Sequence, residues 1–142
     1  MDLRGFARRI RDIGERVERN AGELVPKVAL AIDQGLVVRT PVDTGRARSN
    51  WRVSIGTGLE GTIDAYVKGE AGNTGGANAQ AALLQAQGVL MTYRGKVPVY
   101  ITNNLPYIVR LNEGWSAQAP AGFVELAIQE GVAAINSARL LK

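Results

Sequence analysis

The sequence contains no cysteine and no histidine among its 142 residues. Without thiols it can form no disulfide and no thiolate nucleophile, and without imidazole it lacks the commonest general base and most ligands for zinc, haem and iron–sulfur clusters. Aromatic residues make up only 6% of the chain. No apolar run approaches the roughly 20 residues that a membrane-spanning helix needs, so we expect no contact with a membrane.

What remains is the composition of an ordinary globular protein, with 46% hydrophobic and 21% charged residues. A chain of this length forms a single domain, here residues 1–142, and buries roughly two-thirds of its unfolded surface. The first residues lack the apolar core of a secretory signal, so we expect the protein to be made and kept in a cytoplasm. A net charge of +4 permits contact with nucleic acid or an acidic protein without requiring either.

A long basic amphipathic helix is predicted over residues 1–38. At 100° per residue its apolar residues stay within one stripe of roughly 140°. They are Leu3, Phe6, Ile10, Ile13, Val17, Leu24, Val28, Ile32 and Leu36. Such a helix would run about 50 Å, far beyond the radius of about 15 Å of a compact domain of this size. The helix therefore either breaks between Gly22 and Pro26, or its first half leaves the globule and packs on a neighbouring subunit.

A turn follows this helix and organises the rest of the chain. Thr40-Pro41 ends the helix, because proline lacks an N–H and forces the preceding residue into an extended conformation. Asp43-Thr44-Gly45 predicts a turn whose glycine takes a positive φ. The chain then leaves in a new direction towards Trp51, which we expect to be a core residue because it shares one strand face with Val53 and Ile55.

Alternation of apolar and polar residues predicts three strands. Residues 51–56 and 61–67 form a β-hairpin in this interpretation, and residues 97–103 form the third strand. The glycine-rich stretch 68–78 is typical of a flexible loop.

Helices are predicted over residues 77–93, 105–114 and 121–140. In the first of these, Leu83, Leu84 and either Val89 or Leu90 are the candidate buried positions. The expected fold is α+β: a long N-terminal helical arm over residues 1–38, and a body over residues 39–142. The body would hold a small antiparallel sheet of about three strands, with helices in the middle and at the C-terminus.

No set of residues predicts catalysis. Asp43, Asp64 and Glu113 could in principle hold Mg²⁺, but their spacing matches no known signature. Ser49 and Ser116 have no histidine to activate them. We therefore expect no catalytic residues, no metal and no cofactor, and we do not expect an enzyme.

Two stretches resemble one protein family. Residues 41–51 are similar to the "P-V-D-T-G-R-L-R-x-S-W" turn of tail-completion and head–tail joining proteins of long-tailed bacteriophages. Residues 101–124 resemble that family's C-terminal motif, in the expected order and at the expected separation. The matched positions are Pro41, Asp43, Thr44, Gly45, Arg46, Trp51, Asn103, Pro106, Tyr107, Asn112, Glu113, Gly114, Trp115, Pro120, Gly122 and Phe123.

The resemblance implies a structural virion protein. Its members form a homo-oligomeric ring, expected here as a hexamer, that completes the tail and joins it to the head connector. The implied partners are other copies, neck or connector proteins, and tail-terminator or tail-tube proteins, in the neck of the virion. Basic residues could face a DNA-filled lumen or an interface: Arg8, Arg9, Arg46, Arg48 and Arg52.

Two alternatives remain open from the sequence. The chain could be a tail terminator or head-closure ring protein of the same neck. It could also be a small basic nucleic-acid-binding module, although no aromatic residue lies among its basic clusters to stack on bases.

Overall fold

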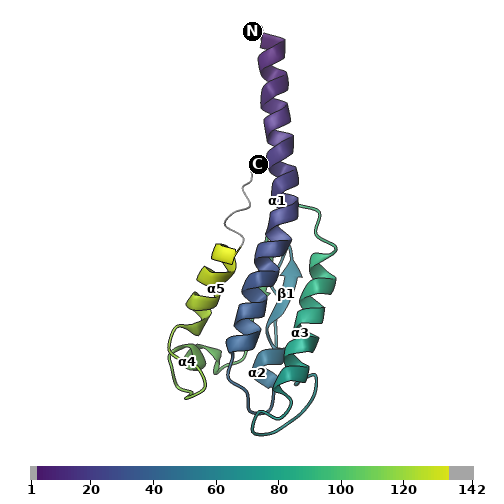
Figure 1. Ribbon diagram of the computed structural model, residues 1–142. Helices are drawn as coiled ribbons and strands as arrows, with labels where there is room; N and C mark the ends of the chain where they lie inside the picture. Colours follow the sequence, from purple (N-terminus) through teal and green to yellow (C-terminus); the bar gives the residue numbers. More distant parts are fainter. Residues whose placement is uncertain (1–2, 135–142) are drawn as a thin grey trace.

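The computed structural model describes residues 3–134, with side chains described from residue 8 onward except at 13–14 and 17–18. It is a mixed helix-and-sheet fold, as predicted for the α+β class (Figure 1). The elements in chain order are α1 (Leu3–Arg39), α2 (Arg46–Ser49), β1 (Arg52–Ile55), α3 (Gly75–Leu90), β2 (Val99–Thr102), α4 (Ile108–Asn112) and α5 (Phe123–Ala134). No helix within the described residues is both long and apolar enough to cross a membrane.

Helix α1 is continuous through Pro26, so the predicted alternative of a break near Gly22 is wrong. Its N-terminal half extends beyond every other element, as Figure 1 shows. The helix ends at Arg39, which confirms Thr40-Pro41 as the stop. Along the apolar stripe Leu36 is buried, whereas Ile10 is 56% exposed. The side chains of Leu3, Phe6, Ile13 and Val17 lie outside the described set.

The sheet differs from the prediction because β1 pairs with β2 and not with residues 61–67. The pairing is antiparallel, with Arg52 opposite Thr102 and Ile55 opposite Val99. The predicted hairpin is therefore wrong, and the described sheet has two strands instead of about three. The alternation along residues 61–67 reflects half-buried side chains at Ile63 and Ala65. The backbone of this segment is bound by side chains of Asn50 and Asn78 and not by a neighbouring strand.

The glycine-rich stretch predicted as a flexible loop is partly helical. Residues 75–78 form the first turn of α3, which begins two residues before the predicted 77 and ends at Leu90 instead of 93. Its buried face is made by Ala82 and Ala86, while Leu84 is 60% exposed. Among the residues proposed for this face, Leu90 is buried.

The described parts of the two C-terminal helices lie within their predicted ranges. Helix α4 covers Ile108–Asn112 within the predicted 105–114. Helix α5 covers Phe123–Ala134, and residues 135–140 of the predicted helix lie outside the described residues.

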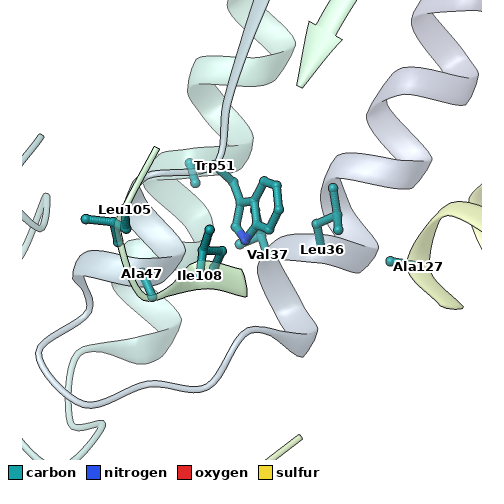
Figure 2. Packing of buried hydrophobic residues seen from close by; sticks show 8 residues of the cluster. Leu36, Val37, Ala47, Trp51, Leu105, Ile108 and Ala127 are labelled. Carbon is teal, nitrogen blue, oxygen red and sulfur yellow. The ribbon is translucent and has the colours of Figure 1, made fainter. Parts of the chain in front are cut away.

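Two hydrophobic clusters hold α1 against the body. The larger contains Leu36, Val37, Ala47, Trp51, Ala82, Leu105, Ile108 and Ala127. Figure 2 shows the Trp51 indole with Ile108 on one side and Leu36 on the other, so its prediction as a core residue is confirmed. The smaller cluster contains Ala29, Val53, Ala86 and Leu90. Helix α1 thus contributes to both clusters, and α5 packs beside it through Ala127.

Asp33 lies between these clusters and was not recognised from the sequence. It is fully buried, and within residues 3–134 neither carboxyl oxygen has a hydrogen-bond partner. Ala29, one turn before it, belongs to the smaller cluster, and Val37, one turn after it, belongs to the larger. Helix α3, which supplies Ala82 and Ala86 to these clusters, carries no ionisable residue. Burial raises the pKa of Asp33 from 3.8 to about 7.

This raised pKa predicts that the protein is less stable at pH 8 than a variant without the carboxyl group. Between pH 4 and 7 the unfolded chain releases the Asp33 proton while the folded chain retains it, so the free energy of unfolding falls as pH rises. The total loss is about 4 kcal/mol, at about 1.4 kcal/mol per pKa unit. Urea unfolding of wild type and Asp33→Asn at pH 4.5, 6 and 8 measures it. We expect the variant to gain stability relative to wild type as pH rises, levelling off above pH 7.

Glu70→Gln is the matched control, because Glu70 is an exposed carboxylate. A difference between wild type and Asp33→Asn that stays constant from pH 4.5 to 8 would contradict the assignment.

Candidate functional site

The two motif-bearing stretches of the sequence meet at one groove, here called the motif groove. It encloses about 380 Å³. Its lining comes from both stretches: Pro41, Val42, Asp43, Thr44, Gly45, Arg46, Ala47, Tyr107, Leu111, Ser116 and Gln118. Residues about 70 positions apart in the chain therefore form a single surface feature.

A reciprocal hydrogen-bonded pair joins the two sides of the motif groove. The backbone N–H of Val42 donates to Gln118 Oε1 at 2.9 Å, and Gln118 Nε2 donates to the Val42 carbonyl at 3.0 Å. The side-chain amide of Gln118 thus pairs with Val42 as a neighbouring strand would. Because Val42 is buried, its backbone groups would otherwise lack partners, and the pair fixes the turn against the segment before α5.

The turn itself is built as predicted, around Gly45 with φ of +90°. The side-chain amide of Asn78 lies against this glycine, where a Cβ atom would collide with it. Asp43 Oδ1 accepts a hydrogen bond from the N–H of Ala71 at 2.9 Å. The carbonyl of Thr44 accepts one from Gly69 at 3.2 Å. The turn therefore anchors the glycine-rich stretch.

Charged and aromatic groups face one another across the motif groove. Burial raises the pKa of Tyr107, Arg46 opposes this shift, and Asp43 adds to it. The Tyr107 hydroxyl therefore remains protonated at neutral pH and can donate a hydrogen bond to a partner. The groove combines an apolar floor with groups able to form hydrogen bonds, which is a surface suited to recognition.

Most C-terminal motif residues have structural roles. Asn103 Nδ2 donates to the Ala47 carbonyl at 3.0 Å, which ties the end of β2 to α2. Asn112 Oδ1 accepts from the Val124 N–H at 2.9 Å, and the Asn112 carbonyl accepts from Gly122 at 2.7 Å. These bonds join the end of α4 to the start of α5.

The remaining motif residues divide between core and surface. Phe123 is fully buried. Pro120 lines a cavity of about 180 Å³ together with Pro41. Gly114 has a φ of +91° and ends α4, and Trp115 after it is 69% exposed, with the Arg110 guanidinium 5.0 Å from its ring centroid. Pro106 and Glu113 are exposed beside α4.

Three of the five basic residues predicted to face DNA or an interface are bound within the fold. Arg48 donates to the carbonyls of Val38, Thr40 and Gly75, and burial lowers its pKa. Arg46 donates to the Ile63 carbonyl and the Thr62 hydroxyl, and Arg52 donates to the carbonyls of Glu60 and Gly61. Arg8 and Arg9 are exposed on the projecting half of α1.

A buried polar cluster that was not predicted from the sequence packs against Gly45, which lines the motif groove. Asn78 is fully buried, accepts from the Val67 N–H at 2.8 Å and donates to the Val67 carbonyl at 2.8 Å. Asn50 forms the same reciprocal pair with Ile63. The Ser49 hydroxyl lies 3.0 Å from Asn78 Oδ1. Asn78 lies in glycine-rich sequence and Ser49 and Asn50 follow a run with two arginines, both of which are typical of exposed segments, so no local signal marked these residues as buried.

The described residues contain no group of three or more side chains placed to hold a metal ion. Comparison with known proteins gives no match, whether to a family model, to a curated protein sequence or to a solved structure. The resemblance to phage neck proteins therefore stays a prediction, and the geometry above is the independent observation bearing on it.

The packing of the Asn78 amide against Gly45 predicts that Gly45→Ala strongly destabilises the fold. The added Cβ would collide with the Asn78 amide, and the alanine would have to adopt a left-handed backbone conformation. We therefore expect a loss of about 3 kcal/mol in the free energy of unfolding. Gly56→Ala is the matched control, since Gly56 has a φ of +88° with nothing within 4 Å of an added Cβ. Urea unfolding compares the two, and equal losses would show that Asn78 does not constrain the turn.

Proposed function

We propose that this chain is a structural virion protein of a phage neck, which forms a homo-oligomeric ring that completes the tail and joins it to the head connector. The proposal goes beyond the fold, which establishes only a mixed α and β architecture. It rests on three features of the described residues, of which the projecting half of α1 carries the most weight.

The first support is the length of α1 relative to the body. A helix of 37 residues spans about 55 Å at 1.5 Å per residue. Within residues 3–134, no other helix or strand lies beside its N-terminal end in Figure 1, the loop at residues 94–96 reaches it only from Glu15 onward, and Ile10 is 56% exposed. An isolated helix without tertiary contacts is marginally stable in water. A neighbouring subunit would supply the missing contacts.

The second support is the joining of the two motif-bearing stretches. The Val42–Gln118 pair uses one residue from each stretch, and Asn103 binds the Ala47 carbonyl across the same junction. The features that carry the resemblance thus form one structural unit. If the chain shares the architecture of the family that it resembles, its two motifs should lie together in the fold in this way.

The third support is the pattern of exposed apolar residues. Leu84, Met91, Val109 and Trp115 are each at least 60% exposed, and they lie on three different parts of the body. A ring subunit presents two different surfaces to its two neighbours, so apolar residues are needed on more than one side. Contact with genomic DNA in the lumen is assigned to Arg8 and Arg9, because the other basic candidates bind backbone carbonyls.

Native mass spectrometry and negative-stain electron microscopy of the purified protein test the proposal. We expect a closed ring, with six copies as the leading stoichiometry, and binding to neck or tail proteins encoded by adjacent genes. Which of those proteins binds also separates tail completion from a tail-terminator or head-closure position.

A protein that stays monomeric at millimolar concentration, alone and mixed with those neighbours, would contradict the proposal. Tight binding of DNA by that monomer at moderate salt would instead favour the nucleic-acid-binding alternative.

A further inference from the structure

The sheet has an unpaired edge that lies beside an apolar groove. Val53 directs its N–H and carbonyl to the side-chain amide of Gln85, away from β2. Val53 and its partner on β2, Ile101, therefore form a non-hydrogen-bonded pair of the ladder. Pairs alternate along an antiparallel ladder, so Val99, two residues before Ile101, is in a non-hydrogen-bonded pair as well. The backbone groups of Val99 and Ile101 therefore point away from β1, and within residues 3–134 no third strand pairs with them.

The same two residues line the groove, here called the edge groove. It encloses about 430 Å³ and is bounded by Leu24, Val28 and Ile32 of α1 and by Val99 and Ile101 of β2. All five side chains are half-buried. An exposed strand edge beside apolar pockets is the arrangement by which proteins bind an added strand.

Basic residues continue the edge groove along the same two elements. A second pocket lies between residues 15–22 of α1 and residues 94–96, which precede β2. Its charged lining residues are Arg19, Arg94, Lys96 and a single acid, Glu15. A strand that enters the edge groove with acidic residues beside it would meet favourable charge here.

One segment of the chain matches these requirements, namely residues 61–67. Its sequence alternates as a strand does, yet it pairs with no strand among residues 3–134. Ile63 and Val67 are bound to Asn50 and Asn78, while in the described chain the backbone groups of Asp64 and Ala65, between them, make no hydrogen bond. Tyr66 and Val67 are about 40% exposed, and two acids, Glu60 just before the segment and Asp64 within it, are exposed, with Lys68 following.

We propose that residues 61–67 of one copy bind the edge groove of a second copy as an added strand, with Glu60 and Asp64 directed towards Arg94 and Lys96. Strand alternation that finds no partner within the chain is then satisfied between chains. The bonds to Asn50 and Asn78, and the bond from the Tyr66 N–H to the Ser49 hydroxyl, keep the segment attached to its own body, while in the described residues the backbone groups of Thr62, Asp64 and Ala65 stay open to a second chain.

The contact is heterologous, because a segment on one copy meets a groove on the next. Repetition of such a contact closes into a ring when the rotation between copies divides a full turn. This inference rests on the proposed ring function and assigns one of the surfaces that the ring would use.

Two single variants test the interface separately. Val28→Glu places an acid in the edge groove and leaves residues 61–67 intact, whereas Asp64→Lys places a base opposite Arg94 and Lys96 and leaves the edge groove intact. We expect each variant alone to lose self-association, with the apparent dissociation constant raised at least roughly tenfold. An equimolar mixture has one intact segment and one intact groove, so it should form 1:1 pairs and nothing larger.

Light scattering after size-exclusion chromatography measures all three samples, and circular dichroism confirms that each variant is folded. The controls are Val132→Glu, which changes an exposed apolar residue on α5, and Glu70→Lys, which repeats the charge change in the loop before α3. Both should assemble as the unmodified protein does. Because the chain has no cysteine, a disulfide formed between Asp64→Cys and Val99→Cys copies would report the contact directly.

The outcomes separate this inference from the proposed function. Rings that persist in Val28→Glu and Asp64→Lys overturn the interface and leave the ring function standing. Open filaments or dimers that are lost in both variants, and return as pairs in the mixture, support the interface and contradict the ring. An unmodified protein that never associates overturns both.

Discussion

The indole N–H of Trp51 donates to the hydroxyl of Thr40 at 2.7 Å, inside the larger hydrophobic cluster. The Thr40 hydroxyl donates in turn to the Leu36 carbonyl at 2.6 Å, and Arg48 donates to the carbonyls of Thr40 and Val38. The final carbonyls of a helix have no partner within it, and in α1 those of Leu36 and Val38 are satisfied by Thr40 and Arg48. This closure fixes where α1 ends and the direction in which β1 begins, so both hydrophobic clusters depend on it.

Side-chain amides, of which Asn50 and Asn78 are fully buried, take the place of a third strand in this fold. Asn50 and Asn78 each accept from one backbone N–H and donate to the carbonyl of the same residue, as a strand neighbour would. Gln85 does the same for Val53 at the edge of the sheet, and Gln118 for Val42 at the motif groove. Each bond is worth about 1 kcal/mol, and more is lost when a buried partner is left unsatisfied. These four side chains therefore specify the path of the irregular segments.

The reliable part of the sequence interpretation was local. The stop at Thr40-Pro41, the positive φ at Gly45 and the burial of Trp51 follow from the chemistry of a few adjacent residues. The pairing of β1 with β2 could not be predicted in this way, because its partner lies more than 40 residues away and the nearer segment 61–67 carries an equally good alternation. Asn78 and Asp33 were missed for a related reason, since their burial is decided by what packs over them.

Because α1 is one unbroken helix, the surfaces along it keep a fixed spacing and orientation. The projecting half and the edge groove at Leu24 to Ile32 follow one another at 1.5 Å and 100° per residue, and the motif groove begins at Pro41, two residues after the helix ends. A neighbour that binds the first or second surface is thereby held at a set distance from the third. Asp33 lies on the same helix, one turn from Val37 and facing the core, so its burial lowers stability without altering that spacing. One continuous helix with separate contact surfaces suits the proposed subunit, which must hold its neighbours in register. The contacts that fix the end of α1 would serve the same role, because they set the orientation of the helix relative to the body.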